Sequence, residues 1–73
     1  MSSRERFAFV DVAPVHAEGG PGMIGIVRDA RSRRVVEKTG VHKTAAKARA
    51  AALKIAERHA MAPVSREEWY GPR

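Results

Sequence analysis

The chain contains one long run of helix-forming residues, Thr44-Ala-Ala-Lys-Ala-Arg-Ala-Ala-Ala-Leu-Lys-Ile-Ala-Glu-Arg-His-Ala-Met-Ala62. Alanine and the unbranched side chains of this run have the highest helix propensities. Thr44 is the expected N-cap, because its hydroxyl can accept a hydrogen bond from the first-turn amides, and His42 is the alternative start. Pro63 stops the helix because proline removes a helical hydrogen bond. The sequence therefore predicts a long helix that ends near Ala62.

The predicted helix has a basic side and an apolar side. At about 100° per residue, Lys47, Lys54 and Arg58 fall within about 40° of one another and form one ridge. The opposite side carries mostly small apolar residues: Ala45, Ala52, Leu53, Ala56 and Ala60, flanked by Ala48, Ile55 and His59. Small side chains let a helix lie close to a sheet but bury little area each, so a thin core of modest stability is expected.

Three strands are predicted before the helix, because three segments are rich in β-branched and aromatic residues. They are Phe7–Ala13, Met23–Arg28 and Arg33–Lys38. The glycine-rich run 16–22 is expected to be a flexible connection, and residues 29–32 a tight turn. Gly25 inside the second strand indicates a bulge or a close approach of the helix.

Consecutive strands with short links usually pair antiparallel. The sequence therefore predicts one α+β domain over residues 1–62. It consists of a three-stranded antiparallel sheet packed by one long C-terminal helix, and a flexible C-terminal tail follows over residues 63–73.

The charge of the chain is segregated. The 73 residues carry a net charge of +6, from 14 Lys and Arg against 8 Asp and Glu. Residues 28–58 hold ten bases and three acids, a net of +7, and the remainder holds four bases and five acids, a net of −1. Such a field attracts polyanions, although many small proteins are basic merely for solubility.

The sequence contains almost no pattern of residues that would support catalysis or metal binding. It has no cysteine, and its three histidines, at 16, 42 and 59, lack a metal-ligand spacing. No serine has a patterned histidine or aspartate beside it, so we expect no catalytic residue, no metal and no cofactor. No apolar run approaches the roughly 18 residues of a membrane span, and the start lacks a secretory signal. A non-enzymatic, cytoplasmic protein that acts as a monomer without membrane contact is expected.

The basic residues form the first candidate binding surface: Arg31, Arg33, Arg34, Lys43, Lys47, Lys54 and Arg58. We expect them to converge into one outward-facing zone that contacts phosphates or an acidic protein surface. Six phosphate contacts would give a log–log salt slope of roughly −5. The basic segment has no aromatic platform for stacking bases, so contact with a backbone is favoured over base reading.

The beginning of the chain forms the second candidate surface. The first strand is apolar on both faces, whereas a sheet covered by one helix needs one apolar face. Either the C-terminal segment covers the other face with Trp69 and Tyr70, or that face is an exposed partner site. A partner could also pair with the strand edge that begins at Arg4. The candidate partner-binding residues are Arg4, Glu5, Arg6, Phe7 and Phe9.

Two loose local resemblances cover about 30 residues. The stretch from Ile26 to Ala48 resembles the end of arm-type DNA-binding domains of phage integrases, in which a basic hairpin precedes a threonine-capped helix. The helix opening Lys43-Thr-Ala-Ala-Lys47 is similar to the last helix of double-stranded-RNA-binding domains. These resemblances imply a direct DNA- or RNA-binding domain.

The chain as a whole resembles the small RNA-polymerase-binding transcription regulators of Xanthomonas-infecting phages. The resemblance lies in the length, the opening Met1-Ser-Ser-Arg-Glu-Arg-Phe7, the absence of cysteine and the composition rich in alanine, arginine and valine. It implies a protein that binds host bacterial RNA polymerase near the amino-terminal region of the β′ subunit, close to the RNA exit channel. Such a protein would inhibit σ-dependent initiation and promote antitermination. A third interpretation is an accessory subunit of an enzyme.

Overall fold

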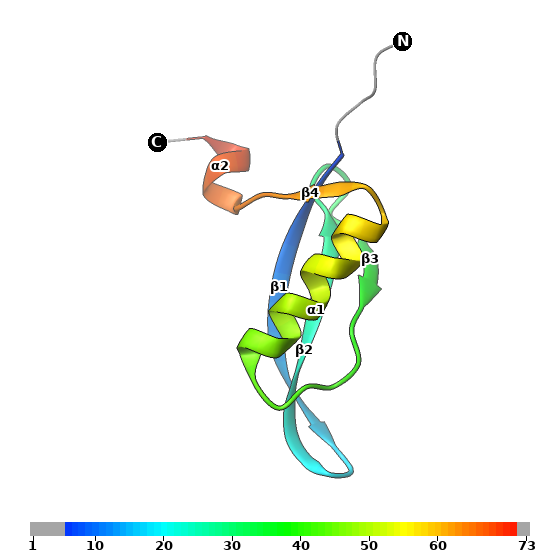
Figure 1. Ribbon diagram of the computed structural model, residues 1–73. Coiled ribbons are helices and arrows are strands. Elements are labelled where there is room, and N and C mark those ends of the chain that lie inside the picture. Colours follow the sequence, from blue (N-terminus) through cyan, green and yellow to red (C-terminus); the bar gives the residue numbers. More distant parts are fainter. Residues whose placement is uncertain (1–5, 72–73) are drawn as a thin grey trace.

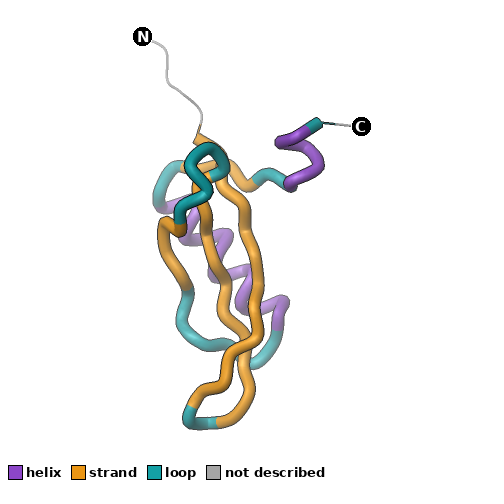
Figure 2. The backbone as a smooth tube through the Cα atoms, turned by 180° about the vertical axis from the view of Figure 1, so that it is seen from behind, coloured by secondary structure: helices purple, strands orange, loops and turns teal. Residues whose placement is uncertain are grey.

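The computed structural model describes residues 6–71, which form one sheet with a long helix along one face and a short helix packed on the first strand from the other face (Figures 1 and 2). The elements follow in the order β1 (Arg6–Ala17), β2 (Gly20–Asp29), β3 (Val35–Lys38), α1 (Ala45–Arg58), β4 (Met61–Pro63) and α2 (Arg66–Tyr70). The sheet has the order β3-β2-β1-β4. Helix α1 lies along one face of the sheet, and the β1–β2 hairpin extends beyond its first turn (Figure 1).

The β1–β2 hairpin is longer than the sequence predicted. The two strands pair antiparallel from Ala8 opposite Asp29 to Ala17 opposite Gly20. Most of the run expected to be a flexible connection therefore belongs to the strands, and the turn is reduced to Glu18 and Gly19. Gly20 has φ of 113°, a conformation that favours glycine and closes this tight turn.

The core lies between α1 and the facing sides of β1 and β2. The buried cluster contains Ala8, Val27, Ala52, Ile55, Ala56 and Met61. Gly25 is the point of closest approach: a Cβ there would meet the Ala48 carbonyl oxygen and lie 2.7 Å from the Ala52 Cβ. The predicted close approach of the helix at Gly25 is thus confirmed, and the small residues of α1 permit it.

Thr44 caps α1, as its sequence position predicted. Its backbone is extended, and its hydroxyl accepts a hydrogen bond from the Lys47 amide at 3.2 Å. The first helical residue is Ala45, so the alternative start at His42 is wrong. His42 instead exchanges backbone hydrogen bonds of 2.7 Å with Met23 and extends the pairing of β2 beyond β3.

The predicted fold class is wrong in two respects. The sheet is mixed and has four strands, because β4 pairs parallel to β1, with Arg6 opposite Met61. The helix ends at Arg58, four residues early, because Ala60 takes a left-handed conformation, with φ of 57°, and turns the chain back toward the sheet. This turn places Met61 in the core, 3% exposed, so burial of Met61 and pairing with β1 outweigh further helix.

The segment after Pro63 contains the short helix α2. Ser65 and Glu68 form a capping box, in which each side chain accepts a hydrogen bond from the backbone amide of the other, at 3.1 Å in both cases. The indole of Trp69 lies 5.6 Å from the Phe7 ring and 6.4 Å from the Phe9 ring, and Tyr70 lies 6.3 Å from Phe9. The side of β1 that carries the two phenylalanines is therefore covered by α2.

Candidate polyanion-binding surface

The predicted partner-binding residues are divided by the structure. Arg4 and Glu5 lie outside the described residues. Arg6 opens β1 with an exposed side chain, 3.8 Å from the Asp29 carboxylate. Phe7 is half-buried, and Phe9 is 2% exposed beneath α2. The strand edge at residues 6–8, expected to be available to a partner, is paired with β4.

Arg66 fastens α2 over Phe9. Its guanidinium lies 4.6 Å from the centre of the Phe9 ring and donates two hydrogen bonds, of 2.7 and 2.9 Å, to the carboxylate of Asp11. This bidentate contact is the main reason that the pKa of Asp11 is lowered. The sequence did not predict this ion pair, because its partners are 55 residues apart and nothing local links them.

Arg31, Arg33 and Arg34, called here the basic turn, lie in the exposed connection between β2 and β3. The Asp29 carboxylate accepts hydrogen bonds from the amides of Arg31, at 2.8 Å, and Ser32, at 3.1 Å. These amides, that of Ser32 first, lower the pKa of Asp29. Arg33 has φ of 64°, and its guanidinium lies 5.5 Å from the centre of the Tyr70 ring.

The exposed residues Lys43, which precedes the N-cap of α1, and Lys47, Lys54 and Arg58 of α1 are called here the helix bases. Within residues 6–71, none of the three lysines forms a salt bridge, whereas Arg58 donates a hydrogen bond to Glu37 at 2.9 Å. Glu37 also lies 2.8 Å from His59 Nε2, and the contacts with His59 and Arg58 lower its pKa. One of the seven predicted bases is therefore neutralised by an acid of β3.

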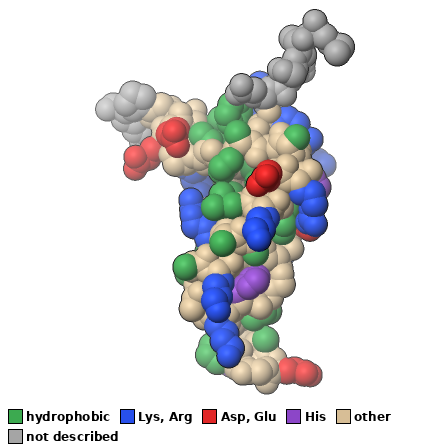
Figure 3. All heavy atoms as spheres, in the orientation of Figure 1, with side chains coloured by type: hydrophobic (Ala, Val, Ile, Leu, Met, Phe, Trp, Pro, Cys, Tyr) green, Lys and Arg blue, Asp and Glu red, His purple; other side chains and the backbone are tan. Residues whose placement is uncertain are grey.

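The basic residues do not converge into one zone. The basic turn lies where β2 ends, beside the start of β1, and Lys43 and Lys47 lie at the other end of α1 (Figure 1). The 14 residues of α1 separate the two ends by about 20 Å. Figure 3 shows Lys and Arg side chains spaced along the face that carries α1 instead of gathered in one cluster. The expected single zone is thus wrong, and the bases form a discontinuous band.

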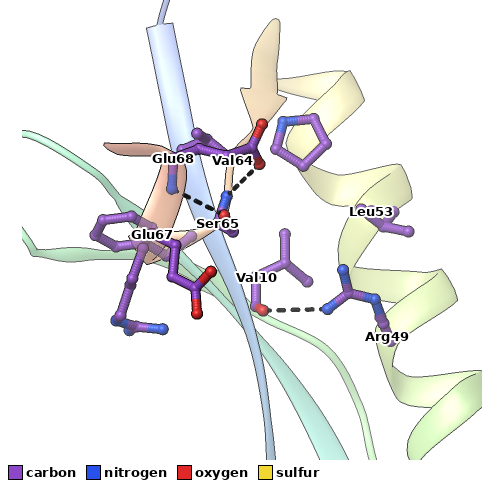
Figure 4. A pocket seen from close by; sticks show the side chains of 10 residues that line it. Val10, Arg49, Leu53, Val64, Ser65, Glu67 and Glu68 are labelled. Carbon is purple, nitrogen blue, oxygen red and sulfur yellow. Dashed lines mark hydrogen bonds between the residues drawn. The ribbon is translucent and has the colours of Figure 1, made fainter. Parts of the chain in front are cut away.

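Two of the hollows among the described residues lie beside α1, one on each side. The larger, about 650 Å³, lies between β1, α1 and the segment leading into α2. Figure 4 shows Arg49 pointing across it toward the Val10 carbonyl, to which its guanidinium donates at 3.5 Å. Arg49 thus contacts the edge of β1 beyond the residues that pair with β4. Ser65, Arg66 and Glu68 of this hollow are also bonded within the chain, so it offers a ligand few unused polar groups.

The smaller hollow, about 370 Å³, lies between β3 and α1 and is called here the β3 hollow. It brings Lys54 and Arg58 together with Lys38 and His42, which the sequence had not selected. Their association depends on how β3 and residues 39–42 pair with β2. The sequence around Lys38 and His42 does not indicate that these residues lie near α1. Their position becomes evident only from the strand pairing in the folded chain.

Searches for related proteins do not assign this chain to a family. No protein-family model, no curated protein and no solved structure matches it. Within residues 6–71, neither helix is long and apolar enough to cross a bilayer. No group of three or more His, Cys, Asp or Glu within that range could hold a metal ion.

Proposed function

We propose that this chain is a non-enzymatic regulator that binds bacterial RNA polymerase, inhibits σ-dependent initiation and promotes antitermination. The docking surface would lie near the amino-terminal region of the β′ subunit, close to the RNA exit channel. The resemblance of the whole chain to phage regulators supplies the identity of the partner. The observation that carries a docking role is the band of exposed bases on two separate elements, six of which have no acidic partner within residues 6–71.

The band suits an acidic protein surface because long basic side chains attract it before contact and adapt to it afterwards. Arg6 lies at the same end of the sheet as the basic turn, since the start of β1 pairs with the end of β2. Phe9 and much of Phe7 are occupied by α2. We therefore propose that docking at this end depends on Arg6 and the basic turn more than on the phenylalanine side chains.

A binding assay with purified polymerase tests the proposal. The full chain is immobilised, and capture of bacterial RNA polymerase holoenzyme is compared with capture by Arg31→Gln/Arg33→Gln/Arg34→Gln and by Lys43→Gln/Lys47→Gln/Lys54→Gln. Each triple variant removes three positive charges, so the two are matched in net charge. Because charge pairs in a specific interface act locally, we expect one variant to lose capture by more than about tenfold and the other to lose less.

Transcription in vitro supplies the functional readout. The chain should reduce transcripts from a σ-dependent promoter and increase read-through of a terminator by polymerase already elongating. Absence of polymerase capture by the unaltered chain at low salt contradicts the proposal, and so does capture without an effect on either transcript.

The second candidate is direct binding of DNA or RNA. The observation that favours it is the row of exposed lysines along α1, which have no acidic partner within residues 6–71, because ammonium groups spaced along a helix can follow a phosphate backbone. A gel-shift at low salt with duplex DNA and duplex RNA separates the candidates. Tight binding that is lost in the lysine triple variant, together with no capture of polymerase freed of nucleic acid, favours the second.

A further inference from the structure

The β3 hollow has an excess of positive charge that no described residue uses. Its lining residues are Glu37, Lys38, Thr39, Gly40, His42, Ala51, Lys54, Ile55 and Arg58. Lys54 forms no salt bridge within residues 6–71. The Lys38 side chain points away from α1, because Lys38 pairs with Ile26 whereas Gly25 and Val27 face the helix. The charged side chains that face the hollow, Lys54 and Arg58 against Glu37, therefore carry a formal charge of +1.

Glu37 does not cancel this excess. Its two carboxylate oxygens are engaged by Arg58, at 2.9 Å, and by His59, at 2.8 Å. The hydrogen bond from His59 is the largest cause of its lowered pKa, so the carboxylate stays ionised and bound to these partners. Arg58 uses one nitrogen on Glu37, which leaves further guanidinium N–H groups for a second anion.

The edge of β3 adds a backbone donor. The Thr39 amide donates to the Gly25 carbonyl at 2.8 Å, so residue 39 faces β2. Alternate residues of a strand face opposite edges, so the amide of Lys38 faces away from β2. No strand covers that edge within the described sheet. Lys38 therefore presents its backbone amide at this edge of the hollow, whereas its side chain, which lies opposite Ile26, points to the sheet face away from α1.

We propose that the β3 hollow binds a phosphate group. The oxygen atoms of a tetrahedral phosphate can accept hydrogen bonds from ammonium, guanidinium and amide groups at the same time. Hydrogen bonds between charged groups are stronger than those between neutral groups. The phosphate can belong to a nucleic-acid backbone or to a free phosphorylated small molecule, since both present the same oxygens. The inference rests on the proposal that the basic band meets a polyanion, and it names the chemistry of one contact.

Titration with inorganic phosphate, followed by amide chemical shifts of the full chain, tests this site. We expect saturable shifts confined to the amides of residues 37–42 and 51–58. The variant Lys54→Gln should weaken phosphate binding by about tenfold, because it removes a charged donor of the hollow. The Lys54 side chain is exposed, so the fold should remain, and a thermal melt checks it.

Arg49→Gln is the matched control. Arg49 lies on the same helix but lines the opposite hollow, and Arg49→Gln removes one positive charge, as Lys54→Gln does. Arg49→Gln should leave phosphate affinity within about twofold of the unaltered chain, because dissolved salt screens the interaction between the phosphate and an exposed charge on the other side of the helix. The proposed site is contradicted if Arg49→Gln weakens phosphate binding as much as Lys54→Gln does. It is also contradicted if amide shifts appear in the basic turn as well, because phosphate would then respond to the overall positive charge of the chain.

Two further arms separate the sources and the partner classes. A short duplex that causes the same shifts at lower concentration than inorganic phosphate identifies the backbone source. A free nucleotide that outcompetes the duplex identifies the small-molecule source. Polyglutamate that shifts these amides while phosphate does not overturns the inference. Polymerase capture without phosphate shifts refutes the hollow and leaves the proposed function standing, whereas phosphate shifts without capture do the reverse.

Discussion

At the scale of single residues, backbone conformation and close contact decide which positions tolerate change. Gly25 and Ala60 illustrate the two cases. Gly25 has no room for a side chain because α1 lies against it. Ala60 has room, being exposed, but its left-handed backbone is unfavourable for a residue with a Cβ.

Gly25→Ala should destabilise the fold. The added methyl group would press on the Ala48 carbonyl and the Ala52 methyl group, so α1 must move away from β2. Overpacking of this kind costs about 1–3 kcal/mol. Urea denaturation measures the loss. Gly19→Ala is the control, because a Cβ there meets nothing within 4 Å, and an equal loss in both variants would contradict the close approach.

Ala60→Gly should stabilise the fold by about 0.5–1 kcal/mol, because glycine adopts the left-handed conformation without the Cβ penalty. For a domain of this size the midpoint of thermal unfolding should rise by a few degrees. Ala50→Gly, an exposed position within α1, should lower stability by about 1 kcal/mol. If both glycine variants lower the midpoint, the chain does not turn at Ala60 as described.

At the scale of elements, features that depend on neighbouring residues could be predicted from the sequence, whereas features that depend on contacts between distant residues could not. The threonine cap of α1 was predicted because a hydroxyl and the amides it caps are neighbours in sequence. The end of α1 was not predicted, because it depends on burial of Met61 and on its pairing with Arg6, 55 positions away. The exposed bases were predicted correctly as exposed, since charged side chains seldom bury. Their grouping around the β3 hollow depends on register and was missed.

The attachment of α2 should be sensitive to acid. The pKa of Asp11 is lower in the folded chain than its ordinary value of 3.8, chiefly because Arg66 hydrogen-bonds to it. This stabilisation is fully present above the unfolded pKa and is lost as pH falls through the lower folded pKa. The chain has one tryptophan, Trp69, which packs on Phe7 and Phe9. Its fluorescence emission should therefore shift to longer wavelength below about pH 3.8.

Two variants assign this transition. Asp11→Asn removes the titrating group, so the transition in Trp69 emission should disappear or lose most of its amplitude. Glu37→Gln removes another carboxyl with a lowered pKa, one held by His59 and Arg58 on the far side of the sheet from α2. It should leave the Trp69 transition in place. The opposite pattern would show that α2 is not fastened through Asp11.

At the scale of the whole molecule, the bases form a band with two ends. A polyanion that spans both ends must contact the basic turn and Lys43 across the length of α1. A shorter one can engage only one end or the β3 hollow. The size of the partner therefore decides how many of the charges act together.

Salt dependence measures how many charges act. If the six unpaired bases all met duplex phosphates, the log–log slope of affinity against salt would be roughly −5. Because the band is divided, we expect a short duplex to give a slope of only about −2 to −3 and a longer one to approach the larger value. Fluorescence anisotropy over a range of salt concentrations measures both. Equal slopes for both lengths would show that the bases act as a single cluster.

The parallel pairing of β4 with β1 also has a consequence during synthesis. Arg6 leaves the ribosome 55 residues before Met61, its neighbour in the sheet. At about 5–20 residues per second, the first strand waits roughly 3–11 s for its partner. Phe7 and Phe9 wait longer still, because Trp69 and Tyr70, which shield them, follow Met61 in the chain. A nascent chain stalled before residue 60 would thus expose an unpaired strand edge and two apolar side chains, and chaperone binding should be greatest at that stage.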